Sequence, residues 1–306
     1  SLVAFSAHAG SLSASGSASL TFSNGDDKSL THEGNQWTMG DSITMTGSGE
    51  MDNGMTISVS YEIDNDDVGG GNVYDSHSMT LDTNGFGTIT FAGHGGSSAM
   101  SALDDVTPNG YQESWDVVTG AETSTLVGGH SGDNMFTYKS PDLSGATVTV
   151  AYLNASDAIT DVSYMDFSIA ADIAAVDGLS VGFGMAETEE TLGTVIDDST
   201  MYAKYTYGSV TIGYQVSESD GPTSATDIDF KAAGITYAVT DDFTIGYSTS
   251  ESDKASDSDV QEATAIGASY TSGGITIGGS MNSIDNVGFD ASADRDGYEF
   301  NISFAF

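Results

Sequence analysis

The last ten residues of the chain, 297–306, alternate strictly between large apolar side chains and small or polar ones. The apolar residues are Tyr298, Phe300, Ile302, Phe304 and Phe306. Because successive side chains of a β-strand point to opposite faces, this segment predicts a strand with one aromatic face and one polar face. Such strands are typical of a membrane barrel, whose outside meets lipid and whose inside meets water.

The same alternation recurs along the whole chain, for example over 11–23, 55–63 and 210–216. Counting these segments gives about sixteen strands, an even number within the range of open-channel barrels. We therefore expect an all-β fold, a transmembrane antiparallel up-and-down barrel. A switch of parity near Ala233 and Gly234 predicts a β-bulge at that point.

The connections between these segments alternate in length. Tight turns, such as those around Asn53-Gly54 and Asn84-Gly85, follow the even-numbered strands, and longer acidic loops follow the odd-numbered ones. This sorting is typical of outer-membrane barrels, which have short turns on one side of the membrane and long loops on the other. The longest connection, 94–133, follows the fifth strand and exceeds what a compact domain tolerates without a function. We expect it to fold into the barrel interior.

Composition agrees with a single barrel domain over 10–306. The chain has 38 Gly, 3 Pro and no Cys, so it has no disulfide framework and few residues that would interrupt a closed hydrogen-bonded ladder. Residues 1–9 end in Ala7-His8-Ala9. This segment is expected to be either a signal-peptide remnant or an N-terminal extension.

Charge excludes several functions. The chain carries 45 Asp plus Glu against 6 Lys plus Arg, a formal charge of −39, which excludes nucleic acid as a partner because phosphate contacts need basic residues. Neither a phosphate-binding loop nor a nucleophile elbow occurs, so we expect no enzyme activity. We expect no cofactor either, apart from weak binding of Ca²⁺ or Mg²⁺ at acidic loops such as 24–27 and 64–67.

The chain resembles the general, trimeric porins of Gram-negative bacteria, and within them the alphaproteobacterial type. The resemblance rests on the alternating ending 298–306, the opening 10–18, the segment Tyr138-Lys139-Ser140-Pro141, the alternating loop lengths and the long loop after the fifth strand. It implies a sixteen-stranded homotrimeric barrel in the cell outer membrane, with the third loop, 94–133, folded inward as a constriction. It also implies that Phe306 belongs to the signal that the barrel-assembly machinery recognises.

The chain departs from the family in its charges, because general porins face the acids of the inward loop with a cluster of arginines. Here the only arginine is Arg295. We expect the acids of the constriction loop to be Asp104, Asp105, Glu113, Asp116 and Glu122. Alternation of side chains places the basic residues Lys139, Lys204 and Lys231 on the pore wall, together with the acids Glu50, Glu62, Asp82, Asp166, Asp172, Asp229, Glu262 and Glu299.

Carboxylates around a pore concentrate cations and exclude anions. We therefore predict a water-filled, cation-preferring channel for passive diffusion of ions and small hydrophilic solutes, with outer-membrane lipid and lipopolysaccharide as its surroundings. Two alternatives stay open. One is an acidic β-rich surface-layer or adhesive protein stabilised by divalent cations, in which the acids serve solubility. The other is a substrate-specific porin.

Overall fold

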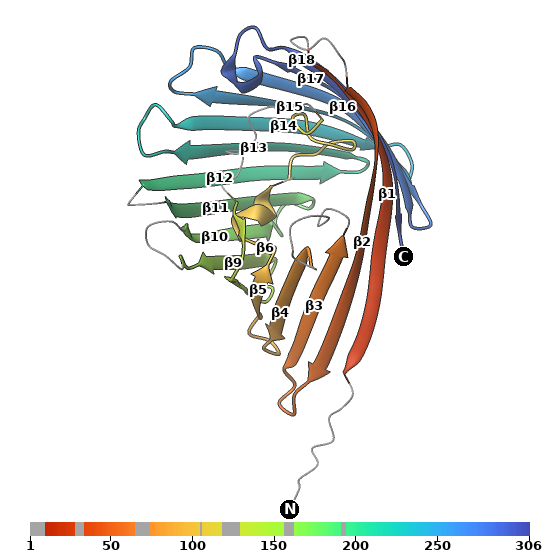
Figure 1. Ribbon diagram of the computed structural model, residues 1–306, viewed down its shortest axis with the longest axis vertical. Coiled ribbons are helices and arrows are strands. Elements are labelled where there is room, and N and C mark those ends of the chain that lie inside the picture. Colours follow the sequence, from red (N-terminus) through yellow and green to blue (C-terminus); the bar gives the residue numbers. More distant parts are fainter. Residues whose placement is uncertain are drawn as a thin grey trace, which may run out of the picture.

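The computed structural model describes residues 10–27, 34–64, 74–104, 106–117, 129–155, 162–190 and 194–306. Sixteen strands close into an antiparallel barrel (Figure 1). They are β1 (Ser11–Asp27), β2 (Gly34–Glu50), β3 (Thr56–Asp64), β4 (Ser76–Asp82), β5 (Thr88–His94), β8 (Met135–Lys139), β9 (Ala146–Leu153), β10 (Ser163–Asp172), β11 (Leu179–Glu190), β12 (Thr194–Tyr207), β13 (Val210–Asp220), β14 (Ile228–Ala238), β15 (Phe243–Lys254), β16 (Gln261–Ser272), β17 (Ile275–Asp285) and β18 (Arg295–Ala305). Each strand pairs with its neighbours in the chain, and β18 pairs with β1 to close the barrel. The predicted fold class is confirmed.

The two faces of the wall differ as the alternation predicts. Large apolar side chains point outward and stay exposed, among them Met281 at 71% and Ile266 at 65%. Their neighbours on the inward face, such as Asn282 at 3%, are covered. Exposed apolar side chains around a closed barrel are suited to contact with lipid. None of the helices in the described part of the chain is long and apolar enough to cross a membrane.

The strands are joined by tight turns at one end of the barrel and longer connections at the other. Two residues separate β12 from β13 and β16 from β17, and Gly273 and Gly274 in the second of these turns have φ of 60° and 82°. Positive φ at both central positions is what a two-residue hairpin turn requires, which is why glycine occurs there. On the other side, nine residues separate β9 from β10 and nine separate β17 from β18, but only three separate β11 from β12, so the predicted sorting of the connections holds for most of them and not for that pair.

The barrel closes through a regular register. Phe306 continues the pairing beyond β18, since its N–H donates to the Gly16 carbonyl at 2.9 Å and its carbonyl accepts from the Gly16 N–H at 2.8 Å. The predicted bulge at Ala233 and Gly234 is wrong, because the pairing of β14 with both neighbours runs through these residues without a shift. Among the described pairings, the register shift lies between β4 and β5, at His77 and Ser78.

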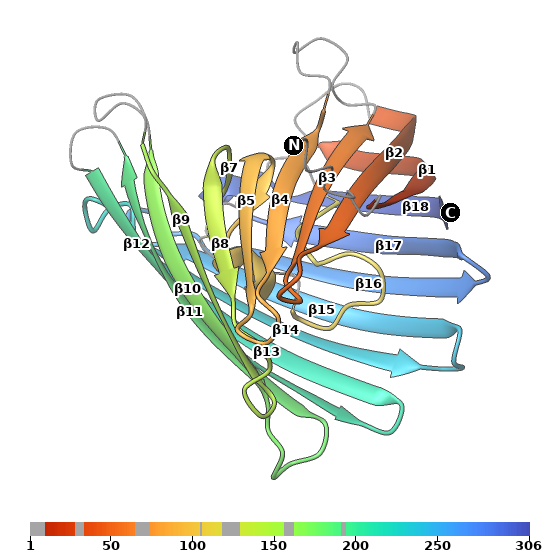
Figure 2. The ribbon, with the colours of Figure 1, turned by 90° about the horizontal axis from the view of Figure 1, so that it is seen from below.

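The connection between β5 and β8 folds into the barrel (Figure 2). It contains the short strands β6 (Gly96–Ser97) and β7 (Ser131–Gly132), which pair with each other, and the 3₁₀ turn η1 (Met100–Leu103). Outside it, a second 3₁₀ turn, η2 (Val287–Phe289), lies between β17 and β18. We call residues 95–134 the inward loop; its contacts with the wall, described next, run from β8 to β18.

Candidate functional site

The two ends of the inward loop are tied together where it leaves the wall. The His94 Nδ1 and the Asp133 Oδ1 lie 2.6 Å apart. The Ser98 N–H donates to the His130 carbonyl at 3.0 Å, and the His130 N–H donates to the Ser98 Oγ at 3.1 Å. These bonds fix the direction in which the loop enters the lumen.

Asp166 of β10 anchors the first part of the loop. Its carboxylate is 3% exposed and accepts the backbone N–H of Met100 at 2.6 Å and of Ala99 at 3.2 Å. It also accepts the Ala151 N–H at 3.1 Å and the Tyr164 hydroxyl at 2.8 Å. A carboxylate that accepts several hydrogen bonds is stable when buried, so Asp166 serves the loop rather than the aqueous path.

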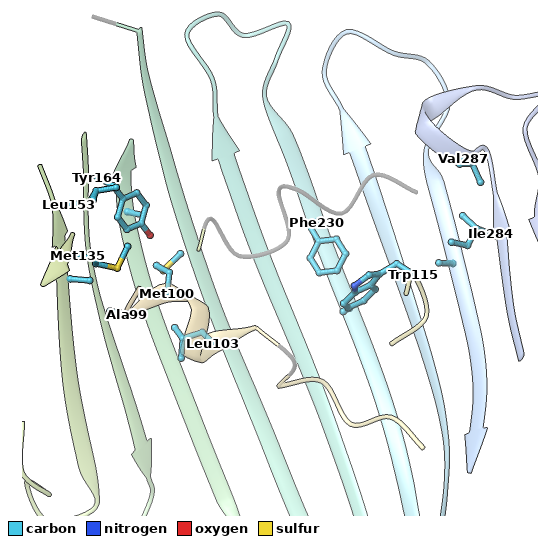
Figure 3. Packing of buried hydrophobic residues seen from close by; sticks show 14 residues of the cluster. Ala99, Met100, Leu103, Trp115, Met135, Leu153, Tyr164, Phe230, Ile284 and Val287 are labelled. Carbon is cyan, nitrogen blue, oxygen red and sulfur yellow. The ribbon is translucent and has the colours of Figure 1, made fainter. Parts of the chain in front are cut away.

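Apolar contacts complete this anchor. Met100 and Leu103 of η1 are fully buried against the inward side chains of Met135 and Leu153, in one cluster with Tyr164 (Figure 3). Such side chains on the inside of a pore need a cover, and the loop supplies it.

The far part of the loop crosses to the opposite strands. The Tyr111 hydroxyl donates to the Glu299 Oε1 of β18 at 2.6 Å. Burial is the larger cause of a raised pKa of Tyr111, and the hydrogen bond to Glu299 is the second cause. The Trp115 ring lies beside Phe230 of β14 (Figure 3) and packs edge-on against it, with ring centroids 5.3 Å apart. The Asn282 side chain donates to the Glu113 carbonyl at 2.7 Å. The loop is therefore held at both ends of its path.

The predicted loop acids have different surroundings. Asp104 and Asp116 are exposed. Glu113 is 5% exposed, and its carboxylate accepts a hydrogen bond from the Asn109 side chain, so it is a structural residue of the loop. Asp105 and Glu122 lie outside the described residues.

The register places most of the predicted wall residues on the inward face. This group contains Lys139, Lys204, Glu50, Glu62, Asp82, Asp166, Asp172 and Glu299. Their part in conduction stays a prediction, as does the assembly role of Phe306.

Three residues predicted for the pore wall lie on the outward face instead. In β14 the inward positions are Phe230 and Ala232, which pack beneath the loop, so Asp229 and Lys231 point outward. The parity rule failed there because it assumed that apolar residues face lipid. Glu262 has the same parity as the exposed Ile266 and also points outward, so its inward placement was wrong.

Asp229 and Glu262 belong to a set of exposed acids on the outward face near the loop-side ends of β11 to β18. We call this set the outer acidic rim. Its members are Glu187, Glu189, Asp197, Glu218, Asp220, Asp229, Glu251, Asp253, Glu262, Asp285 and Asp296.

The wall opposite the anchored loop has a composition that the prediction missed. The inward positions of β1, from Ser11 to Ser23, are all Ser or Thr, and most of them pair with Ser or Thr of β2; the exceptions are Ser19 with Gly40 and Ser23 with Gln36. Hydroxyl contacts link them, including Ser11 with Ser48 at 2.7 Å. Hydroxyl side chains also line the inward faces of β3, β4 and β5. We call this the hydroxyl wall. The residues at alternate positions of 11–23 were the signal that could have revealed it.

Among the described residues, no group of three or more His, Cys, Asp or Glu side chains is arranged to hold a metal ion. The acidic loops proposed for weak Ca²⁺ or Mg²⁺ binding fall largely on residues or side chains outside the described part.

A barrel with an apolar outside, a polar inside and a loop folded into its lumen defines an outer-membrane channel. A sequence model of the Gram-negative porin family matches residues 1–265, so the chain belongs to the Gram-negative porins and lies in the outer membrane. A comparison with curated protein sequences gave no match.

Solved porin structures have the same fold. An anion-selective porin from Comamonas acidovorans superposes with a TM-score of 0.74 at 15% identity, covering 97% of this chain and 100% of its own. A multiple mutant of the Rh. blastica porin gives 0.72 at 18% identity with the same coverage. A loop-deletion mutant of the Vibrio cholerae outer-membrane protein OmpT gives 0.71 at 17%, again with the same coverage. At these identities the likeness establishes the fold alone.

We expect the docking of the loop to depend on pH through His130. Its ring stacks on Tyr164 with centroids 4.9 Å apart, and burial lowers its pKa below 6.5, a shift opposed by Asp166. A released loop therefore binds the proton more readily than a docked one, so docking weakens as pH falls through 6.5. We expect faster protease cleavage of the loop at pH 5.5 than at pH 7.5. In a His130→Phe variant this difference should shrink, and an unchanged difference would refute the assignment.

Proposed function

We propose that this porin is a cation-preferring channel for the passive diffusion of ions and small hydrophilic solutes. The observation that carries the proposal is the distribution of charge across the lumen. Asp104 and Asp116 are exposed residues of the inward loop, and the described inward side chains in β1 to β5 include hydroxyls and acids but neither Lys nor Arg.

Electrostatics then favours cations throughout the pore. The acids Glu50, Glu62 and Asp82 lie on the same side as the hydroxyl wall, so both sides of the lumen attract positive charge. Four inward Lys or Arg side chains in the described part of the chain oppose this field. Lys139 and Lys204 are the predicted ones, and the register also places Lys254 and Arg295 on the inward face, at the loop-side ends of β15 and β18. Low-dielectric walls focus the field of such carboxylates and raise the local concentration of cations.

Size exclusion is the second part of the mechanism. The inward loop occupies part of the lumen, and solutes pass between it and the hydroxyl wall. Hydroxyl groups both donate and accept hydrogen bonds, so they can replace part of the hydration shell of a polar solute without selecting its charge. Transport of this kind needs no coupling to an energy source.

The oligomer and the surroundings follow from the family. Porins of this family are generally trimeric, and we propose the same state for this chain, in contact with outer-membrane lipid and lipopolysaccharide after delivery by the barrel-assembly machinery. The exposed apolar outside argues against the surface-layer alternative, in which the same residues would form a core.

Recording in planar bilayers tests the proposal. Purified protein under a tenfold KCl gradient should insert in conducting steps, grouped in threes for a trimer, with a reversal potential of the sign set by K⁺. Ideal cation selectivity would give a reversal potential of about 59 mV, the value for a tenfold concentration ratio of a singly charged ion. A reversal potential near zero, or of the opposite sign, would refute the cation preference. Block by one class of solute alone would favour the substrate-specific alternative.

A further inference from the structure

Five glycines on the inward faces of β13 to β17 form a path across the wall beneath the loop. We call Gly213, Gly234, Gly246, Gly267 and Gly278 the glycine track. Gly213 pairs directly with Gly234, and Gly246 pairs directly with Gly267. The track therefore crosses five neighbouring strands without a side chain in its way.

Residues 108–111 of the inward loop lie on this track. A methyl carbon at any of the five glycines would stand under 3.0 Å from an atom of Pro108, Gly110 or Tyr111, a separation that real Cβ atoms essentially never show. From the loop side, a methyl carbon at Gly110 would collide with the Gly267 carbonyl. Loop and wall are thus in backbone-to-backbone contact at the centre of the track.

These glycines are required for space and not for conformation. None of the five has a positive φ, so another residue could adopt the same backbone angles. The contact is also anchored on both sides, by Asp166 before it and by Glu299 after it. The loop therefore cannot move along the wall to make room for a larger residue, and its remaining direction of movement is into the lumen.

We propose that the glycine track sets the size limit of the channel, by keeping the loop flush against the wall and the passage beside it open. The proposal rests on the diffusion function proposed above and names the residues that determine its size selection. Because the track carries no charge, it controls the width of the pore independently of the acids that control its ion preference.

The test is the pair of variants Gly213→Ala and Gly246→Ala, with Gly47→Ala as the matched control. Gly47 lies in strand β2 of the same barrel, and a methyl carbon there would meet nothing within 4 Å. An overpacked contact displaces backbone, so we expect single-channel conductance to fall to about half or less in both track variants. Uptake of larger sugars into proteoliposomes should fall more than uptake of small ones. The reversal potential of both track variants should equal that of the wild type. The Gly47→Ala channel should match the wild type in conductance, sugar uptake and reversal potential.

A compensating change separates the loop contact from damage to the wall. The methyl group at position 213 would strike the Cγ and Cδ atoms of Pro108, which Pro108→Ala removes. The Gly213→Ala, Pro108→Ala double variant should therefore have most of the conductance of the Pro108→Ala variant. This comparison remains possible even if Gly213→Ala alone fails to fold.

Two results would overturn the proposal: track variants that conduct and sieve like the Gly47→Ala control, or a double variant as impaired as Gly213→Ala. A wild-type protein without conductance would instead refute the diffusion function itself.

Discussion

Replacing Asp104 and Asp116 together by Asn should reduce the ratio of cation to anion permeability by roughly fivefold, because in a wet, salt-screened pore we expect the two charges together to change the energy difference between cation and anion by about 1 kcal/mol. Both are exposed residues of the inward loop. Asn keeps an oxygen at position 116 that can still accept the Glu113 N–H, a bond of 3.0 Å in the native loop. The change therefore removes charge without removing the turn. Reversal potentials in a KCl gradient measure the effect.

The matched control removes two charges from the outside of the barrel. Glu218→Gln and Asp220→Asn alter exposed acids on the outward face of β13, where the register separates them from the lumen. This variant should keep the native reversal potential. Equal losses in the two double variants would mean that ion preference follows total charge and not the loop.

Replacing Asp166 by Ala should release the inward loop, the largest structural effect that we expect from one side chain. Four donors would lose their acceptor, namely the N–H groups of Ala99, Met100 and Ala151 and the Tyr164 hydroxyl. Unsatisfied buried donors cost about 1 to 3 kcal/mol each, and water entering from the lumen would offset part of that. We expect docking of the loop to weaken by about 3 kcal/mol. Noisier single-channel currents and rapid protease cleavage within 95–134 would report the release.

Asp172→Ala provides the comparison, since this acid lies on the same face of the same strand and is exposed. It should leave current noise and cleavage unchanged. If both variants behaved alike, the effect at Asp166 would come from removing lumen charge. A loop that stayed protected in Asp166→Ala would show that Tyr111, Trp115 and the glycine track suffice to hold it.

The fold was predictable because its signals are local. Alternation with a period of two can be recognised within one strand at a time. The hairpin turns are recognised from their own residues, such as Gly273 and Gly274. The inward path of the loop followed from its length and from the resemblance to porins. None of these inferences required knowledge of which residues meet across the lumen.

The site was less predictable because its contacts join residues that are distant in the sequence. Asp166 meets η1 across 66 positions, and Tyr111 meets Glu299 across 188. Alternation showed that Asp166 points inward but not that the loop buries it. The same reason explains Phe230, whose inward side chain becomes favourable only because Trp115 covers it. The glycine track, with one residue on each of five strands, has no pattern along any single strand.

The outer acidic rim determines the depth at which the barrel lies in the membrane. Outward side chains change in order along several strands, from Met201 through Ser199 to Asp197 in β12 and from Met281 through Ser283 to Asp285 in β17. A carboxylate drawn into hydrocarbon costs roughly 1 to 3 kcal/mol, so the rim resists any sinking of the barrel on that side. The upper limit of the acyl chains is therefore fixed at the level of the serine and threonine residues, and the outward side chains determine how deep the barrel lies in the bilayer.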